Sequence, residues 1–507
     1  MSEKINTALI SVHCKDGLDE IIHELSRLQV KLISTGGTRE YIQSLGYECD
    51  SVEDITDFPS ILGGRVKTLH PKMLGGILFR RDNETDRKQI KSYAIPPIDL
   101  VIVDLYPFEE TVATGGTEEE IIEKIDIGGV SLIRGAAKNY KDVLTVASRK
   151  QYKLLLDLLK TKKNTSDIDD RRRFARDAFK VASGYDAAIF RYFDEGEFSG
   201  LRITDDEARQ LRYGENPHQW GTFYGSFNEI FEQLNGKEIS YNNLLDIDAA
   251  VSIIAEFDET ALAILKHTNA CGMACRPTVK EAWETALATD SVSAFGGVVI
   301  TNRPIDKAAA EVIDEMFLEI IIAPAFDTEA LEILKQKKNR IILVLRSVNK
   351  ALQKIQYRSV LNGTLVQKRD NKIQTAANLK VVTKVAPTES ETEDLLFANK
   401  LVKHTKSNAI VLAKDKQLIS SGKGQSSRVE ALNQAIRNAT TSGFDLKGAV
   451  MASDAFFPFP DCVEMAHKAG ITAIIQPGGS IRDTESINYC DENSVAMVIT
   501  EVRHFKH

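Results

Sequence analysis

A basic and a titratable side chain stand next to each other where an apolar segment ends. Residues 262–266 read Leu-Ala-Ile-Leu-Lys, and His267, Thr268 and Asn269 follow at once. A buried strand is apolar and does not require a lysine and a histidine at its end. An amine beside an imidazole can instead hold and move protons. The simpler interpretation is a strand end in solvent, and this segment alone favours it. The catalytic interpretation depends on partners that other segments bring to Lys266 and His267.

A second group of chemically capable residues lies near the start of the chain. Thr35-Gly36-Gly37-Thr38 stands between an apolar segment and a helical pattern, and Lys15 follows the first apolar segment. Glycines admit a ligand close to the backbone, and the free N–H groups of a helix start attract anions. A Gly-Gly turn alone indicates only a turn. With Lys15 after the neighbouring strand of an open α/β sheet, it predicts a phosphate site.

Further polar residues follow in loops of the same region. Arg65 and Lys67 lie in a stretch bounded by Gly63-Gly64 and Pro71, which favours a shaped loop over a charged helix face, although a basic surface loop is the alternative. Tyr106 follows an apolar segment and faces either a cleft or the core. Asp126 opens a helix, where an aspartate is most simply an N-cap. Lys138 lies further along that helix, where a lone lysine is usually solvated.

These residues need a scaffold, and apolar segments alternate with helical patterns along the chain. Strands are predicted at 8–12, 31–34, 100–103, 143–146, 263–265, 298–301, 341–345, 410–413, 449–452 and 472–475, and helices near 118–124 and 130–139. Residues 417–420 and 410–413 flank a short polar turn, which predicts a hairpin. We expect a loop at 162–170 and a helix over 171–193 that starts with a solvated Arg171-Arg172-Arg173 run. The alternation predicts an α/β fold with a parallel sheet covered on both faces.

The composition limits the class of protein. A chain of 507 residues is too long for one core, so we expect at least two domains, with a boundary near 195–205. The net charge of −8 argues against a nucleic-acid surface, and no apolar run is long enough to span a membrane. The N-terminus does not resemble a signal peptide, and the six scattered cysteines are typical of reduced thiols. We therefore expect a cytoplasmic protein.

Three more motifs decide between the interpretations of the Lys266–His267 segment. They are Leu-Arg-Tyr-Gly-Glu-Asn-Pro-His-Gln at 211–219, Val-Lys-His-Thr-Lys-Ser-Asn at 402–408 and Ser-Asp-Ala-Phe-Phe-Pro-Phe at 453–459. Together the segments resemble the AICAR transformylase–IMP cyclohydrolase family. The resemblance implies a methylglyoxal-synthase-like cyclohydrolase domain at 1–199. It also implies a transformylase domain at 200–507, built from two α/β subdomains similar to cytidine deaminase. The zinc-ligand motifs of that fold are absent, so we expect no zinc.

The resemblance implies roles for the first group of residues. The 5′-phosphate of FAICAR would be bound by Lys15, Thr35, Gly36, Gly37 and Thr38, with Arg65 nearby. The ring that closes would be surrounded by Lys67, Tyr106, Asp126 and Lys138. Two positions depart from the family pattern, because His13 replaces a small hydroxyl residue and Asp104 stands where asparagine is common. An unpaired carboxylate near an anionic ligand would weaken its binding.

For the second half, the resemblance implies formyl transfer from 10-formyltetrahydrofolate to AICAR. His267 would be the base, and Lys266 and Asn408 would orient the formyl group and stabilise charge. The substrate-binding residues would be Arg212, Tyr213, Asp290, Arg428, Phe456, Asp461 and Arg503; a frayed basic tail is the alternative for Arg503. Asp454 is a candidate ligand of the potassium ion that the family carries. The segment Asn242–Asp246 also matches the family, without an implied role.

The resemblance implies a homodimer with the transformylase site at the subunit interface, acting on small molecules, not on nucleic acid or a membrane. Two alternatives compete with a bifunctional enzyme. One is a transformylase with an impaired cyclohydrolase site, given His13 and Asp104. The other is a non-catalytic nucleotide-binding protein that has kept the scaffold. The proton-handling groups favour the bifunctional enzyme, since binding alone does not require them.

Overall fold

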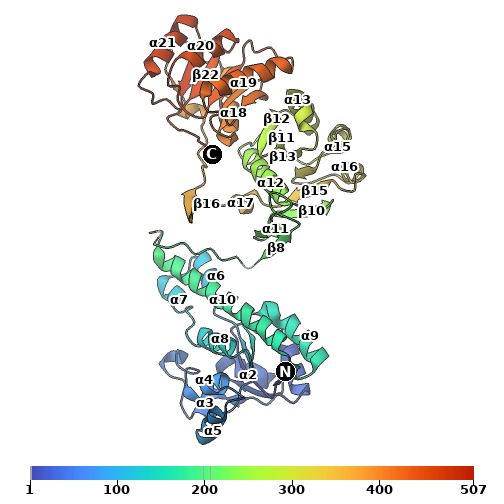
Figure 1. The fold of residues 1–507 in the computed structure, drawn as a ribbon, viewed down its shortest axis with the longest axis vertical. Coiled ribbons are helices and arrows are strands. Elements are labelled where there is room, and N and C mark those ends of the chain that lie inside the picture. The colour runs from blue at the N-terminus through green and yellow to red at the C-terminus, as the bar shows by residue number, and fades with distance from the viewer. Residues whose placement is uncertain (1–2, 198, 206) are drawn as a thin grey trace. The chain divides into compact units, whose positions relative to one another are not determined.

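The structure is a computed structural model that describes residues 3–197, 199–205 and 207–507. The chain divides into two compact units, residues 1–206 and 207–507 (Figure 1). None of the helices in the described ranges is both long and apolar enough to cross a membrane.

The first unit is built on a parallel five-stranded sheet in the order β4-β3-β2-β5-β6. Its strands are β2 (Thr7–Ser11), β3 (Lys31–Ser34), β4 (Asp50–Ser51), β5 (Leu100–Val103) and β6 (Leu144–Val146). The predicted bounds of β3 and β5 are confirmed. Their side chains are almost all buried, as continuous apolar runs in a sheet covered on both faces require.

Two separate clusters of side chains cover the faces of this sheet. Because successive strand residues point to opposite faces, Ala8 and Ile10 pack with α1 (Leu18–Arg27) and α9 (Tyr152–Lys162). Leu9 packs on the other face with α4 and α8. The other elements of this unit are α2 (Gly36–Ser44), α3 (Val52–Thr56), α4 (Pro71–Leu78), α5 (Glu84–Ser92), α6 (Phe108–Ala113), α7 (Glu118–Ile122), α8 (Gly128–Lys138), β1 (Glu3–Lys4) and β7 (Thr165–Ser166).

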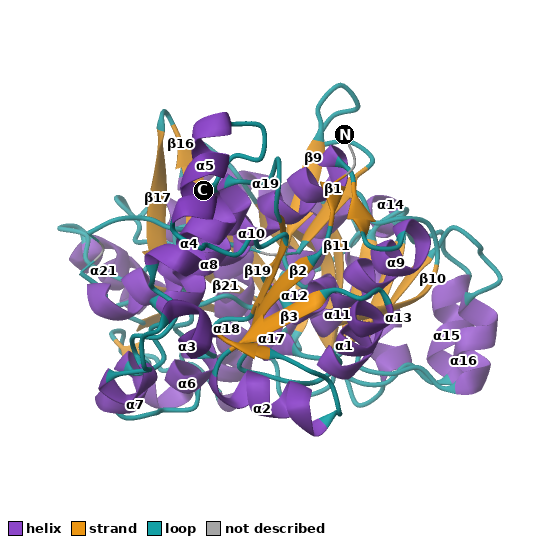
Figure 2. Cartoon of the chain, turned by 90° about the horizontal axis from the view of Figure 1, so that it is seen from below, coloured by secondary structure: helices purple, strands orange, loops and turns teal. Residues whose placement is uncertain are grey.

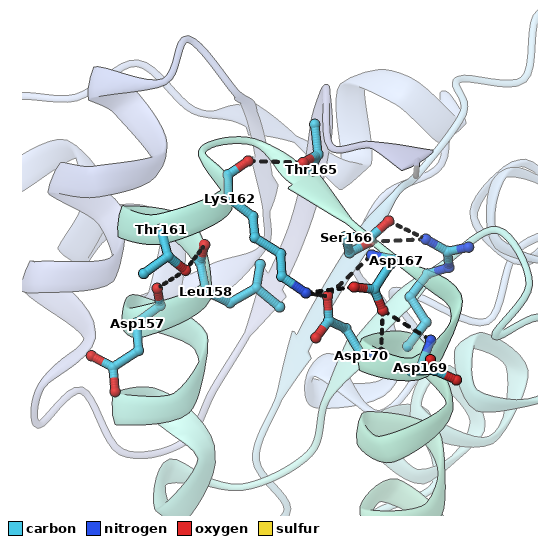
Figure 3. Close-up of polar contacts among 10 residues, drawn as sticks. Asp157, Leu158, Thr161, Lys162, Thr165, Ser166, Asp167, Asp169 and Asp170 are labelled. Atoms are coloured by element: carbon cyan, nitrogen blue, oxygen red, sulfur yellow. Dashed lines mark hydrogen bonds and ion pairs between the residues drawn. The ribbon is translucent and has the colours of Figure 1, made fainter. Parts of the chain in front are cut away.

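The long helix α10 (Ile168–Asp194) begins earlier than predicted, and its start is not solvated as expected. Asp167 and Asp170 form a capping box, and the Nζ atom of Lys162 lies 2.5 and 2.6 Å from their carboxylates (Figure 3). Arg171 is only 2% exposed and donates hydrogen bonds to the carbonyls of Ser166 and Tyr140. The Arg171-Arg172-Arg173 run therefore contains one structural arginine, and the prediction of a solvated run was wrong for Arg171.

The second unit contains one sheet of twelve strands, in the order β10-β15-β14-β13-β11-β12-β20-β19-β21-β22-β23-β18. The strands of its first half are β10 (Phe231–Asn235), β11 (Ala261–Lys266), β12 (Asn269–Cys275), β13 (Val298–Thr301), β14 (Ile320–Ala323) and β15 (Ile341–Leu345). Those of its second half are β18 (Lys380–Val381), β19 (Ile410–Lys414), β20 (Gln417–Gly422), β21 (Val450–Ser453), β22 (Ala473–Gln476) and β23 (Ala496–Ile499).

The two halves of this sheet repeat one arrangement. In each half an antiparallel hairpin (β11–β12 or β19–β20) is followed by three parallel strands and an antiparallel edge strand. The innermost strands β12 and β20 pair antiparallel and join the halves. The helices correspond too: α12 (Tyr241–Ile254), α13 (Val279–Thr289), α15 (Lys307–Asp314) and α16 (Thr328–Leu334) match α18 (Glu389–His404), α19 (Arg428–Thr441), α20 (Asp461–Lys468) and α21 (Asp483–Asn493). This is the arrangement expected of two α/β subdomains.

A few short elements complete the second unit. They are β8 (Ala208–Leu211), β9 (Gly221–Tyr224), α11 (Phe227–Ile230), α14 (Ser291–Ala294), α17 (Val348–Ala351), and the strands β16 (Ile355–Val360) and β17 (Gly363–Lys368), which lie side by side as an exposed hairpin (Figure 2). The predicted hairpin of 410–413 with 417–420 is confirmed, with longer strands.

Candidate active sites

A cavity of about 650 Å³ opens at the carboxyl ends of β2, β3 and β5 in the first unit. The cavity is lined by eight of the ten residues that the family resemblance implies for nucleotide binding or ring closure. These eight are Lys15, Thr35, Gly37, Thr38, Arg65, Lys67, Tyr106 and Asp126. Gly36 and Lys138 are not part of its lining. The cavity lies where open α/β sheets bind ligands.

The Gly-Gly turn forms the start of α2 on one side of this cavity. Gly36 has a φ of +53°, a conformation that side-chain-bearing residues rarely adopt. Its Cα faces the Lys67 amine, because a Cβ atom built on Gly36 would lie 3.9 Å from the Lys67 Nζ atom. The Thr38 hydroxyl is used within the fold, because it bridges the N–H (3.1 Å) and the carbonyl (2.9 Å) of Val12. The groups left for an anion are the first N–H groups of α2 and the nearby lysines.

Lys15 and Thr35 already have partners inside the chain. The Lys15 Nζ donates to the carbonyls of Val12 (2.7 Å) and His13 (2.9 Å), which places this ammonium at the end of β2. The Thr35 hydroxyl donates to Glu53 at 2.7 Å. Burial alone would raise the pKa of Glu53, but hydrogen bonds from Thr35, its own backbone and Ser51 hold that pKa below its ordinary value. A negative charge therefore stays beside the Gly-Gly turn.

The two departures from the family pattern support each other. The Asp104 carboxylate accepts hydrogen bonds from the backbone N–H groups of His13 and Cys14, the latter at 3.1 Å. The ring of His13 packs edge-on against Tyr106, with ring centres 5.4 Å apart. Asp104 therefore fixes the loop that carries Lys15, and its charge is compensated by two amides. This pairing leaves no pattern in the sequence, because the partners are 90 and 91 residues apart.

Three groups suited to proton transfer and charge stabilisation face the cavity together. Burial, with the Asp126 carboxylate nearby, raises the pKa of Tyr106, so the phenol stays a donor. Burial also raises the pKa of Asp126, although the Gly129 N–H at 2.6 Å and the charge of Lys67 oppose this. The N-cap position of α8 is Ile127, not Asp126, although the Asp126 carboxylate accepts from the first turn of that helix. Asp126 also lines the cavity, and its role in proton transfer stays a prediction. Lys67 makes no ion pair within the described part of the chain.

Lys138 does not join this group. It is exposed and ends α8, whereas Gly128 at the start of that helix lines the cavity. Ten helical residues separate the two positions by about 15 Å, farther than a lysine side chain reaches. The expectation that Lys138 surrounds the ring is therefore not supported.

Two further charged residues line the cavity that were not predicted from the sequence, Glu123 and Lys124. Arg65 also lines the cavity and forms an ion pair with Glu123. The Lys124 Nζ atom lies 5.8 Å from the centre of the Tyr106 ring.

In the second unit, Lys266 and His267 lie where β11 turns into β12. The strand ends at Lys266, and His267 (φ 52°) with Thr268 (φ 63°) forms a two-residue hairpin turn. Ending the strand there removes the alternation that would send the two side chains to opposite faces. The Lys266 Nζ donates to the Phe295 carbonyl at 2.7 Å, while His267 is exposed. The sequence analysis did not predict β12, which returns directly from this turn.

Asn408 comes to the same end of the sheet from the other half. β12 and β20 pair antiparallel at Ala274–Gln417, so the start of β12 lies at the same end of the sheet as Lys423, which directly follows β20. Two residues further, Gln425 exchanges backbone hydrogen bonds with Asn408 and accepts another from its side chain at 2.9 Å. The sheet therefore brings the Lys266–His267 turn and Asn408 to one edge.

Arg428 and the C-terminal segment lie beside Asn408. Arg428 forms a nearly buried ion pair with Asp454 at 3.2 Å, and its guanidinium lies 5.7 Å from the Phe505 ring. Arg503 packs on the same ring at 4.4 Å. The tail is anchored by backbone bonds from His504 to Asp454 and from Ser407 to Lys506. The alternative of a frayed basic tail therefore does not hold.

Comparison with known proteins supports the resemblance over the whole chain. A sequence model of the family described as "AICARFT/IMPCHase bienzyme" matches residues 136–438, and one described as "MGS-like domain" matches residues 17–131. A protein of Bacteroides thetaiotaomicron named "Bifunctional purine biosynthesis protein PurH" is 64% identical over all of this chain and 99% of its own length. The chain belongs to the AICARFT/IMPCHase bienzyme family. The expected methylglyoxal-synthase-like fold of the N-terminal region is confirmed with it.

More distant members of the bienzyme family match at full length as well. Proteins with the same printed name from Acetivibrio thermocellus and Bacillus subtilis are 47% and 46% identical over 99% of this chain and 100% of their own. Among solved structures, "Crystal structure of ForH" aligns with 37% of this chain and 98% of its own, at 32% identity and a TM-score of 0.33.

Neither of the two cavities described for residues 3–197, 199–205 and 207–507 gathers the remaining substrate-binding residues expected for this bienzyme. Asp290 lines a cavity of only about 40 Å³, formed by β12 and β20. Arg212 stacks on Tyr213 at 5.7 Å and is exposed. Phe456 is 37% exposed, and Asp461 stands exposed at the start of α20. A folate cosubstrate needs several hundred Å³, so these residues line an open surface.

Proposed function

We propose that this chain catalyses the last two steps to IMP: formyl transfer from 10-formyltetrahydrofolate to AICAR, then dehydrative ring closure of FAICAR. Residues 1–199 carry ring closure and residues 200–507 carry formyl transfer. The observation that supports this most is the first cavity, which places cations, a neutral phenol and a half-buried carboxyl group around one space beside a helix start. Membership of the bienzyme family agrees with both steps.

Ring closure joins two groups of one substrate. The carboxamide nitrogen of FAICAR attacks the formamide carbonyl, and water leaves. With the 5′-phosphate held by Lys15 and the α2 amides, the two groups stay in contact, and proximity lowers the barrier. Lys67 stabilises the oxyanion that forms. Tyr106 donates a proton, and Asp126, whose pKa burial raises, accepts and returns one.

Formyl transfer requires a base because the AICAR amine is conjugated and weakly nucleophilic. The amine attacks the formyl carbon and His267 takes its proton. The bond between the formyl carbon and N10 then breaks, N10 takes up a proton, and tetrahydrofolate leaves. Lys266 and Asn408 hold the formyl oxygen and stabilise its charge. Arg212, Tyr213, Arg428 and Arg503 bind the nucleotide, with Asp290 and Phe456 at the base and Asp461 at the pterin ring; arginine suits phosphate because it can donate two parallel hydrogen bonds.

The open surface around these residues supports a homodimer. One chain leaves Arg212, Arg503, Asp461 and Phe456 partly or fully exposed, and the cavity at Asp290 is too small for either substrate. A second copy of the chain would enclose them and exclude water from the reacting groups. The AICAR site would therefore be completed at the subunit interface.

Asp454 fits the potassium ion that the resemblance implies. Its side chain is fully buried, and its Oδ2 atom has no hydrogen-bond partner among the residues that the structure describes. A buried carboxylate oxygen without a donor is unfavourable unless a cation meets it. Potassium there would hold the tail and the segment before Asn408 in place. Exchange of potassium for a large organic cation should then lower transformylase activity and leave ring closure unchanged.

The first alternative to a bifunctional enzyme is a transformylase with an impaired cyclohydrolase site. Adding FAICAR without folate tests this alternative, because an impaired site would leave FAICAR unconverted. Any turnover of AICAR or FAICAR excludes a purely nucleotide-binding protein. The paired Asp104 carboxylate favours a working site, since its charge is compensated within the loop.

A further inference from the structure

The duplicated arrangement of the second unit places one aspartate under each hairpin turn. Asp246 and Asp394 are each the sixth residue of their helix, α12 and α18. The Thr268 N–H donates to Asp246 at 2.6 Å, and the Lys416 N–H donates to Asp394 at 2.6 Å. The last residue of each hairpin's first strand is also a lysine with the same kind of contact. The Lys414 Nζ donates to the Lys447 carbonyl at 2.8 Å, and the Lys266 Nζ donates to the Phe295 carbonyl at 2.7 Å.

Both turns need such support because neither contains glycine. His267 and Thr268 have φ values of 52° and 63°, and Asp415 and Lys416 have 51° and 49°. Holding a side-chain-bearing residue in this region is unfavourable. A carboxylate that accepts from the turn amides offsets part of that cost. One role of Asp246 is therefore structural and is shared with Asp394.

The two aspartates differ in what their second oxygen does. In the second half, the other oxygen of Asp394 accepts from the Asp415 N–H at 2.8 Å, and the residue is 4% exposed. In the first half, His267 takes the place of Asp415, and its N–H makes no such bond. No donor in the described ranges contacts the second carboxylate oxygen of Asp246, and the residue is only half-buried. The half that carries the base thus keeps one carboxylate oxygen free beneath it.

The imidazole is the titratable group best placed to use that oxygen. It belongs to the residue directly before Thr268, whose N–H binds the Asp246 carboxylate at 2.6 Å. Burial raises the pKa of Asp246, and the positive charge that His267 can carry opposes this rise. The other charged groups around Asp246 are engaged. Glu319 pairs with Lys237 at 2.8 Å and accepts from Asn243 at 3.1 Å, and Lys266 is held by Phe295.

We propose that Asp246 is a positioning residue for His267, whose imidazole donates a hydrogen bond to the free carboxylate oxygen when the substrates are bound. This inference rests on the proposed role of His267 as the base of formyl transfer. A hydrogen bond from one ring nitrogen fixes the tautomer and leaves the other nitrogen to accept the proton from AICAR. The carboxylate then stabilises the imidazolium that forms. This gives a function to the Asn242–Asp246 segment.

Two matched variants of the full-length enzyme test the proposal. Asp246→Asn keeps an oxygen that can accept from Thr268 but removes the charge and the acceptor for the imidazole. Asp394→Asn makes the same change at the equivalent position of the half without His267. The kcat and KM for AICAR are measured across pH with saturating 10-formyltetrahydrofolate. Conversion of FAICAR to IMP is measured on the same samples as a control for folding.

For Asp246→Asn we expect a loss of about 10–100-fold in transformylase kcat, with the KM for AICAR changed less than about threefold. The acidic limb of the kcat–pH profile should move to lower pH by about one unit, because a neighbouring negative charge favours a protonated imidazole. Asp394→Asn should keep the wild-type kcat and pH profile. A wild-type kcat and profile for Asp246→Asn would overturn the proposal. So would equal losses in both variants with no movement of the profile, because that is a structural effect only.

His267→Asn separates this inference from the function on which it rests. If His267→Asn keeps full formyl transfer, the assignment of the base fails and the role of Asp246 fails with it. If His267→Asn is inactive while Asp246→Asn behaves as wild type, the base stands and only the positioning role is excluded.

Discussion

At the scale of single residues, the first site depends on a lysine without an ion pair near the half-buried carboxyl group of Asp126. Lys67 has no ion-pair partner in the described ranges and faces the Gly-Gly turn. Lys67→Ala should lower the kcat of FAICAR ring closure by about 10²–10³-fold, the usual loss when one oxyanion donor is removed. Formyl transfer by the same protein should not change. The formation of IMP from FAICAR is followed, and full ring closure in the variant would refute the role of Lys67.

Asp126 links activity with stability. Burial raises its pKa above the ordinary value of 3.8, so its contribution to stability is fully present below that value. The contribution is lost as the pH rises through the raised pKa, because the folded chain must then bury a charge. Asp126→Asn should therefore raise the midpoint of thermal unfolding at pH 7 by up to a few degrees while ring closure falls. The difference should vanish near pH 3. A variant that is less stable at pH 7 would contradict this sign.

At the scale of elements, the start of α10 depends on a buried arginine. Arg171 occupies three acceptors, the Ser166 carbonyl and hydroxyl and the Tyr140 carbonyl. Arg171→Met leaves those acceptors buried without donors and should lower the free energy of unfolding by about 3 kcal/mol. Arg172→Ala is the matched control, because its exposed neighbouring side chain should change stability by less than about 0.5 kcal/mol. Chemical denaturation measures both. Similar values for the two would show that the buried contacts contribute little.

Apolar patterns were enough to predict most central strands, but they did not predict which polar side chains meet. Residues 298–301 and 341–345 have the predicted bounds because a fully buried strand must be apolar throughout. The return strand β12 was missed because Asn269 and Gly272 suggest a turn. The pairing of Asp104 with the His13 loop was also missed, since hydrogen bonds between distant segments leave no periodic signal. The same limit explains why Lys138, placed by resemblance alone, lies outside the cavity.

At the scale of the whole molecule, we expect the C-terminal tail to affect only one of the two activities. Its backbone binds Asp454 and Ser407, and it carries Arg503. Removal of residues 502–507 should lower formyl transfer by more than about 100-fold, because the segment before Asn408 loses its partners. Arg503→Ala should mainly raise the KM for AICAR. Both proteins should close FAICAR to IMP at the wild-type rate, since the first unit carries that site. A parallel loss of ring closure would contradict the separation of the two activities.

The central claim is that one chain performs both steps. The most direct test incubates the purified protein with AICAR and 10-formyltetrahydrofolate, follows absorbance and identifies the nucleotide product by chromatography. We predict IMP, with FAICAR only as a transient. Lasting accumulation of FAICAR would mean that the first unit does not close the ring despite the paired Asp104. Absence of any formylated product, with substrates and potassium present, would contradict the account of the second unit.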